Sequence, residues 1–156
     1  MELMITRLGE ILKRKGLKLA VAESCTGGLL GGAITAAAGS SSYFRGGVIA
    51  YDNDIKRDIL GVPADDLERY GAVSSAVVLA MAAGAAKLFS ADCAISVSGI
   101  AGPGGGTDEK PVGLVFIGVH HQGQTQSRAF VFKGSRDDVR SQSVMAAMEF
   151  LIDVIG

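Results

Sequence analysis

The sequence predicts an α/β fold, a three-layer α/β/α sandwich built on a mixed β-sheet. Short apolar segments alternate with helical segments over most of the chain, which is typical of parallel strands joined by helices. Two later segments flank a Gln122-Gly123 turn, and the second of them alternates polar with apolar residues, which predicts an antiparallel hairpin. The 156 residues suffice for one buried core, so we expect a single domain over residues 1–156.

Each expected element rests on hydrophobic spacing and on a local start or stop signal. In the first half we expect a surface helix that ends near Gly16, a strand at 17–22, a helix to about residue 38, a strand at 44–50 and a helix capped by Asp52 or Asn53. In the second half we expect a helical turn at 65–70, an apolar helix at 76–89 capped by Ser74 or Ser75, strands at 92–98, 112–120 and 124–132, and a helix at 136–155 capped by Ser135.

Composition and charge exclude several classes of function. The net charge is −1 and no basic stripe stands out, so we expect no nucleic-acid partner. No apolar run is long enough to span a membrane and no secretory signal heads the sequence, so we expect no membrane partner. Cys25 and Cys93 are isolated, which predicts reduced thiols and a cytoplasmic location. His120 and His121 are adjacent on one strand and face opposite ways, so we expect no metal site.

The serine-rich stretch GSSSYFRGGVIAYDNDIK offers the groups that nucleophilic chemistry requires. It holds possible nucleophiles at residues 40–42, the phenol of Tyr51 and the amine of Lys56. A loop, a strand and a helix start follow one another here, and we expect them to bring their groups into one pocket. From the residues alone, Lys56 could equally be a solvated helix lysine and Tyr51 a core residue.

Two glycine-rich turns are candidates for holding a ligand. The turn ESCTGG lies between a buried strand and a helix, where free amides can cradle an anion. Equally, Ser24 or Thr26 could cap that helix. The longer loop, SVSGIAGPGGGTDEKPVG, begins with Ser98 at the end of a strand, and the amides of Gly99 and Gly102 could wrap a phosphate. The alternative for this second turn is a flexible hairpin loop.

Three stretches, AESCTGG, GSSSYFRGGVIAYDNDIK and SGIAGPGGG with KPVG, together resemble the CinA C-terminal domain family. The resemblance runs in the family's order from about residue 22 to the last helix, nearly the whole chain. It implies an anticodon-binding-domain-like α/β/α sandwich. It also implies a stand-alone member that hydrolyses the carboxamide of nicotinamide mononucleotide to nicotinate mononucleotide and ammonia, in pyridine nucleotide salvage and without a cofactor.

The resemblance also implies roles for particular residues. The family's nucleophilic serine matches Ser41 in the best register, although the neighbouring serines, Ser40 and Ser42, leave that register open. Its lysine matches Lys56 and its tyrosine matches Tyr51. A lysine that acts as a base near neutral pH needs a pKa lowered from about 10.4 to about 7, which burial can supply.

Substrate contacts are expected from the two glycine turns, the central strand and the last helix. The expected substrate-binding residues are Ser24, Thr26, Gly27, Gly46, Gly47, Ser98, Gly99, Gly102 and Arg140. Arg140 is a possible phosphate partner, against the alternative of a solvated arginine. Arg45 is the cation nearest in sequence to Lys56 that could help to lower its pKa.

A second class of function is open on the same residues. A non-catalytic module could use the glycine turns to hold a phosphorylated nucleotide and regulate a partner. The joint presence of Ser41, Tyr51 and Lys56 favours the hydrolase, because a pure binder needs none of the three. The apolar helix and the close-packing glycines leave room for an interface, so we expect a homo-oligomer, with a dimer possible.

Overall fold

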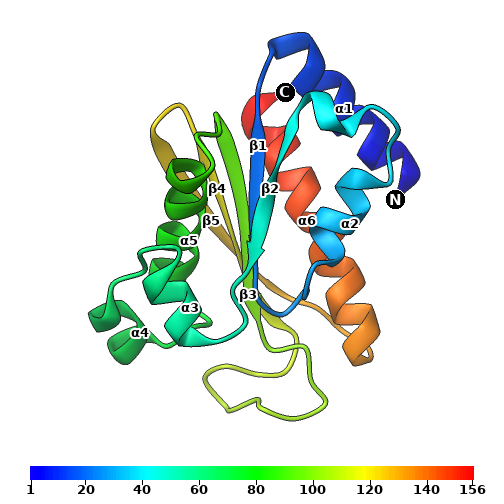
Figure 1. Ribbon diagram of the computed structural model, residues 1–156. Helices are drawn as coiled ribbons and strands as arrows, with labels where there is room; N and C mark the ends of the chain where they lie inside the picture. The colour runs from blue at the N-terminus through cyan, green and yellow to red at the C-terminus, as the bar shows by residue number, and fades with distance from the viewer.

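The computed structural model describes residues 1–156 as a five-stranded mixed sheet between two layers of helices (Figure 1). The strands are β1 (Leu19–Glu23), β2 (Phe44–Ile49), β3 (Cys93–Gly99), β4 (Leu114–His121) and β5 (Gln124–Val131). Their order across the sheet is β2-β1-β3-β4-β5. The first three strands are parallel, whereas β4 and β5 form the predicted antiparallel hairpin.

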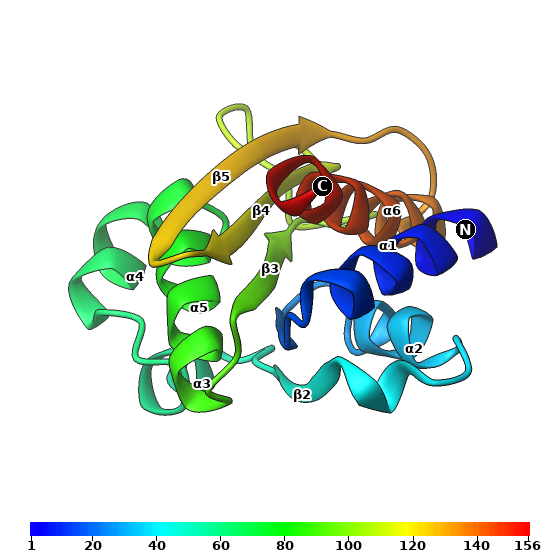
Figure 2. The same cartoon turned by 90° about the horizontal axis from the view of Figure 1, so that it is seen from above.

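Helices cover both faces of the sheet (Figures 1 and 2). One layer contains α1 (Glu2–Lys15), α2 (Leu29–Thr35) and α6 (Arg136–Ile155), and the other contains α3 (Asn53–Asp58), α4 (Ala64–Tyr70) and α5 (Ser75–Leu88). A larger apolar cluster lies under the α1–α2–α6 layer and a smaller, alanine-rich cluster lies under α5. The predicted three-layer α/β/α sandwich with a mixed sheet is confirmed. None of the helices combines the length and apolar composition needed to cross a membrane.

The local signals in the sequence set most helix ends. Gly16 adopts the left-handed conformation after α1, with φ of 65°. Asp52, Ser74 and Ser135 each accept a backbone N–H at the start of α3, α5 and α6, which satisfies donors that a helix leaves free. Helix α2 is shorter than expected, because the chain turns away after Thr35 toward the 3-10 helix η1 (Ser40–Ser42).

Parallel strands place the ends of β1, β2 and β3 at the same side of the sheet. This carboxyl edge, at the bottom of Figure 1, is surrounded by α3, the loop 100–113 and the first turn of α6. The opposite, amino edge holds η1 beside the end of α1. Ligands in α/β sheets bind outside the carboxyl ends of the strands, so this edge is where a site is expected.

Gly84 allows α3 and its connection to lie directly on α5. A Cβ at Gly84 would lie 1.9 Å from the carbonyl oxygen of Leu60. The same connection is tied to α3, because Val62 N donates to the Lys56 carbonyl over 3.0 Å. A side chain at Gly84 would therefore push the α3 region away from the sheet.

We expect Gly84→Ala to destabilise the protein by about 1–3 kcal/mol, the usual cost of overpacking. Gly32→Ala is the matched control, because a Cβ there meets nothing within 4 Å inside helix α2. That control should be neutral or stabilising by up to about 1 kcal/mol. Urea denaturation measures both, and equal effects would contradict the close approach of Leu60 to α5.

Candidate active site

The most unusual side chain in the molecule is a buried lysine at the carboxyl edge. Lys56 is only 1% exposed and ranks among the largest fully buried side chains. Its Nζ donates to Ser24 Oγ over 3.1 Å and to the Tyr51 carbonyl over 3.1 Å, and it forms no ion pair. Burial lowers the pKa of the Lys56 amine, an effect that the Asp52 charge opposes in part. The amine is therefore biased toward its neutral form.

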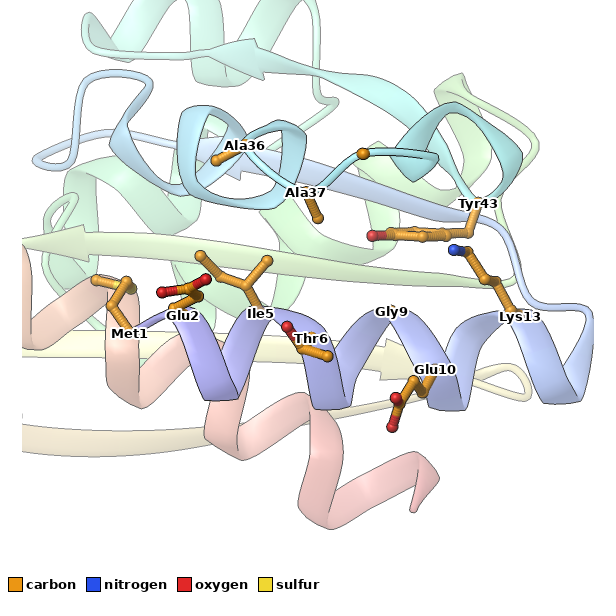
Figure 3. A pocket seen from close by; sticks show the side chains of 11 residues that line it. Met1, Glu2, Ile5, Thr6, Gly9, Glu10, Lys13, Ala36, Ala37 and Tyr43 are labelled. Carbon is orange, nitrogen blue, oxygen red and sulfur yellow. The ribbon is translucent and has the colours of Figure 1, made fainter.

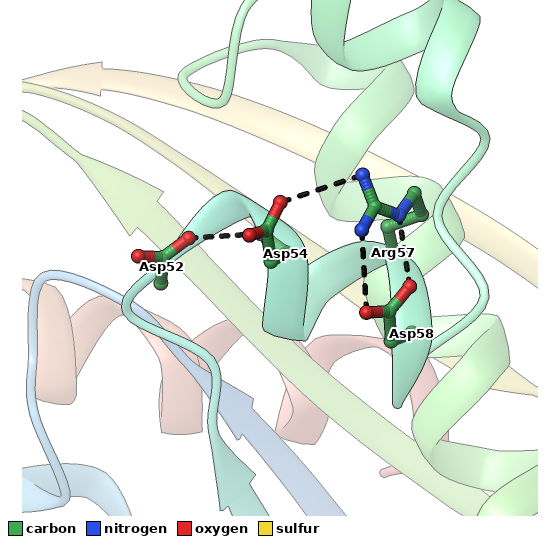
Figure 4. A network of polar contacts seen from close by, with 4 residues as sticks. All are labelled: Asp52, Asp54, Arg57 and Asp58. Atoms are coloured by element: carbon green, nitrogen blue, oxygen red, sulfur yellow. Dashed lines mark hydrogen bonds and ion pairs between the residues drawn. The ribbon is translucent and has the colours of Figure 1, made fainter.

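The charges around Lys56 on α3 are satisfied among themselves. Asp52 accepts the Asp54 N–H over 2.9 Å and thereby starts the helix. Arg57 pairs with Asp58 at 2.8 Å and with Asp54 at 3.4 Å on the exposed side of the helix (Figure 4). The outward face of α3 thus carries its own ion pairs, and Lys56 is the charged residue of α3 that turns inward.

Ser24 directly follows β1, and Ser98 lies near the end of the neighbouring strand β3. Glu23 pairs with Val97 in the β1–β3 register, and Ser24 N donates to the Val97 carbonyl over 2.9 Å. Ser24 and Ser98 come next on strands about 4.8 Å apart. Both are buried, and alternation along the strands puts them on the α5 face. The structure therefore brings Ser24 and Lys56 together and sets Ser98 alongside.

Unused backbone donors follow Ser24. The amides of Cys25 and Thr26 lie outside any helix or strand and donate to no acceptor on another residue. In nucleophile elbows the amide after the nucleophile stabilises the oxyanion. Burial raises the pKa of the Cys25 thiol to about 11, so Cys25 is not an activated nucleophile.

In the ESCTGG turn, the carboxylate of Glu23 occupies the position expected for an external anion. Glu23 is 2% exposed, and its carboxylate accepts the Thr26 hydroxyl at 2.6 Å. It also accepts the N–H groups of Gly28, Leu30 and Gly31 at 3.2, 2.9 and 3.0 Å. The expectation that these amides cradle an external anion is wrong for this helix start, because Glu23 already occupies it.

Neither alternative proposed for capping α2 is correct, since no side chain of Ser24 or Thr26 caps the helix. Glu23, which was not predicted to have this role, satisfies the first amides of α2 instead. An acidic residue just before a glycine turn and a helix was the available signal, because carboxylates are stabilised at helix amino ends.

Arg140 holds the same turn from the opposite layer. Its Nε donates to the Cys25 carbonyl over 3.1 Å and its Nη2 to the Thr26 carbonyl over 3.3 Å. A Cβ at Gly27 would lie 3.2 Å from that Nη2, so Gly27 leaves room for the guanidinium. Arg140 is half-buried, and through Nε and Nη2 it supports the turn after Ser24.

Ser41 lies at the other end of the molecule. It is exposed and belongs to η1 at the amino edge, where Lys18 Nζ donates to the Ser42 carbonyl and Leu19 N donates to the Tyr43 carbonyl. The six residues of β2, at about 3.3 Å each, separate η1 from the segment that leads to Lys56. The expectation of one pocket for both ends of this strand is therefore wrong, for Ser40 and Ser42 as well.

Two further expectations concern residues of β2, which is an edge strand of the sheet. Gly46 and Gly47 lie within β2, and a Cβ would meet Phe89 at 3.1 Å or Val21 at 2.5 Å, so these glycines serve close packing. Arg45 Nε donates to the Phe89 carbonyl, which places its charge away from Lys56. The lowered pKa of Lys56 comes from burial and not from Arg45.

Tyr51 reaches an arginine that the sequence analysis missed. Tyr51 is 62% exposed, and its hydroxyl accepts from Arg136 Nη2 over 3.3 Å. Arg136 Nη1 also donates to the Gly102 carbonyl over 2.8 Å. Gly102 has φ of +85°, and a Cβ at Gly99 would lie 2.6 Å from Val115. These two glycines thus shape the start of the loop at the carboxyl edge.

The principal cavities lie elsewhere. The largest, about 650 Å³, is bounded by α1, the segment after α2 and Tyr43 (Figure 3). None of the four principal cavities is lined by Ser24, Tyr51 or Lys56. No group of three or more His, Cys, Asp or Glu side chains is placed to hold a metal ion. Ser24 and Lys56 therefore lie outside these four cavities, at the strand ends.

This arrangement defines an α/β protein with a serine and a buried lysine at the strand ends. The model of the CinA C-terminal domain family matches residues 2–155, and the chain belongs to this family. A CinA-like protein of Rippkaea orientalis is 50% identical over 153 residues, which cover 96% of this chain. The chain spans only 37% of that relative's length.

Solved structures agree closely with the fold. The competence/damage inducible protein CihA of Agrobacterium tumefaciens superposes with a TM-score of 0.95 at 42% identity, over 98% of this chain and 94% of that one. A competence-damaged protein (CinA) superfamily protein of Escherichia coli gives 0.94 at 35% identity, over 97% and 88% of the two chains.

The burial of Lys56 predicts a pH dependence of stability. Because its folded pKa is lowered, the unfolded chain binds the proton more readily up to its ordinary pKa near 10.4. Stability contributed by this group therefore rises with pH in that window. We therefore compare the free energy of unfolding of the wild type with that of Lys56→Met. The wild-type value minus the Lys56→Met value should increase as pH rises from about 7 toward about 10.

Urea denaturation at several pH values measures this difference. Lys87→Met is the matched control, since Lys87 is an exposed lysine on α5. If the difference in free energy of unfolding between wild type and Lys56→Met stays constant or falls as pH rises, the result would contradict a desolvated amine at Lys56.

Proposed function

We propose that this chain hydrolyses the carboxamide of nicotinamide mononucleotide to nicotinate mononucleotide and ammonia, with Ser24 as nucleophile and Lys56 as base. The observation that carries the proposal is the 3.1 Å contact between Lys56 Nζ and Ser24 Oγ around a fully buried amine. This distance lies within the reach of a general base. The choice of substrate rests on the family resemblance.

The reaction has two stages, acylation and deacylation, and Ser24 and Lys56 act in both. As Ser24 Oγ bonds to the carboxamide carbon, neutral Lys56 takes the hydroxyl proton. The ammonium then gives that proton to the leaving nitrogen, the C–N bond breaks and ammonia departs. Water attacks the acyl-serine ester while Lys56 accepts its proton. The ammonium returns that proton to the departing Ser24 Oγ as the ester bond breaks, and the acid product releases a proton to solvent as it becomes the carboxylate.

The surrounding groups suit this chemistry. The unused amides of Cys25 and Thr26 can donate to the oxyanion that develops on the carboxamide oxygen. Tyr51 lies at the edge of the site, where its phenol can contact the substrate. Ser98 and the loop that begins at Gly99 offer a hydroxyl and backbone groups for the nucleotide.

Ser41 does not fit the role of nucleophile, because Lys56 lies at the opposite edge of the sheet. A serine there would need another base, and the groups near η1 are the ammonium groups of Lys13 and Lys18. We therefore assign the roles of the family's serine and lysine to Ser24 and Lys56. The competing function, a nucleotide-binding module without catalysis, needs no buried amine against a hydroxyl.

We expect Ser24→Ala to lower kcat for ammonia release from nicotinamide mononucleotide by at least about 10³-fold, because removing the nucleophile of a catalytic pair has effects of this order or larger. Ser41→Ala is the matched control and should stay within about twofold of wild type. Isothermal calorimetry should still detect binding to Ser24→Ala.

The possible results separate the candidates. Loss of activity in Ser41→Ala with retention in Ser24→Ala would contradict this assignment. Binding of the nucleotide with no hydrolysis by the wild type would instead support the binding module.

A further inference from the structure

We propose that Arg136 is a positioning residue that holds the Tyr51 phenol and the start of the 100–113 loop over the catalytic pair. This inference rests on the proposed function, since it gives Tyr51 a fixed place in that site. It begins from two contacts: Arg136 Nη2 donates to Tyr51 Oη over 3.3 Å and Arg136 Nη1 to the Gly102 carbonyl over 2.8 Å.

The two hydrogen bonds of Arg136, to Tyr51 and to Gly102, form a bridge between parts of the chain that otherwise lie on opposite sides of the sheet. Arg136 is the first residue of α6, in the layer of α1 and α2, whereas Tyr51 leads into α3 in the layer of α5. Gly102 belongs to the loop between β3 and β4. In Figure 1 the first turn of α6, this loop and α3 surround the lower end of the sheet. The three segments meet beyond the strand ends, where Ser24 lies.

Tyr51 needs such a support because burial does not fix its ring. The residue is 62% exposed, and the hydrogen bond from Arg136 is the one polar contact of its side chain. Its backbone is held separately, since Lys56 Nζ donates to the Tyr51 carbonyl. Removal of Arg136 would thus free the phenol while the catalytic pair stays in place.

The chemistry of the bridge requires a guanidinium. Its planar fork directs two N–H groups to two acceptors at once. A lysine keeps the charge but presents a single nitrogen on a flexible stem, so it cannot serve the phenol and the Gly102 carbonyl in the same geometry. Arg136→Lys should therefore recover only part of what Arg136→Ala loses.

The kinetic test is a double-mutant cycle with nicotinamide mononucleotide. We expect Arg136→Ala to lower kcat by about 10–100-fold, the scale of a misplaced catalytic group, with a thermal unfolding midpoint close to wild type. In the Tyr51→Phe background the loss should be at least about fivefold smaller, because contacting residues couple. Equal losses in both backgrounds would overturn the inference, as would full activity of Arg136→Ala.

A second readout does not depend on activity. Glu109 is the one glutamate in a loop, and the other glutamates lie in helices or strands. A glutamyl endopeptidase should cut after Glu109 faster in Arg136→Ala than in wild type. Arg45→Ala is the matched control, because it removes a guanidinium bond to the Phe89 carbonyl at the other edge. Unchanged cleavage in Arg136→Ala would overturn the loop contact.

The two tests also separate this inference from the proposed function. A wild-type protein that releases no ammonia would end the proposed function. The bridge would then be judged by cleavage alone, with faster cleavage in Arg136→Ala supporting it and unchanged cleavage rejecting it.

Discussion

The buried amine of Lys56 against the Ser24 hydroxyl is the interaction on which the rest of the site depends. Desolvation of an unpaired ammonium is costly, so the fold must hold this side chain in place by other means. The Asp52 cap and the exposed ion pairs of Arg57 stabilise α3 internally. The close approach of Leu60 to Gly84 seats the segment after α3 on α5. The lowered pKa of the Lys56 amine is thus a consequence of packing.

The turn after β1 is also held in place by hydrogen bonds, with Glu23 and with α6. Glu23 fills the start of α2, and Arg140 ties the Cys25 and Thr26 carbonyls to α6. The carbonyls and the helix amides are thereby occupied, whereas the Cys25 and Thr26 amides are left free beside Ser24. The turn that carries these free donors is thus fixed from both sides.

Local sequence signals made the fold predictable. The site residues could not be chosen in the same way, because the choice depends on the end of the sheet at which each residue lies. The caps at Asp52, Ser74 and Ser135 act within one turn of helix, so the sequence shows them directly. The choice between Ser41 and Ser24 needed the sheet: a strand separates Ser41 from Lys56, whereas Ser24 and Lys56 both follow parallel strands. Arg136 could not be predicted, since its contacts join a helix start to a loop and a strand end far apart in sequence.

The most direct test of this account is to trap the acyl-enzyme. Wild-type protein mixed with nicotinamide mononucleotide and quenched in acid within one turnover should carry an ester on the tryptic peptide that covers residues 19–45, which contains both Ser24 and the three serines of η1. Fragmentation mass spectrometry assigns the position. The account predicts the added mass on Ser24, and its appearance on Ser40, Ser41 or Ser42 would contradict it.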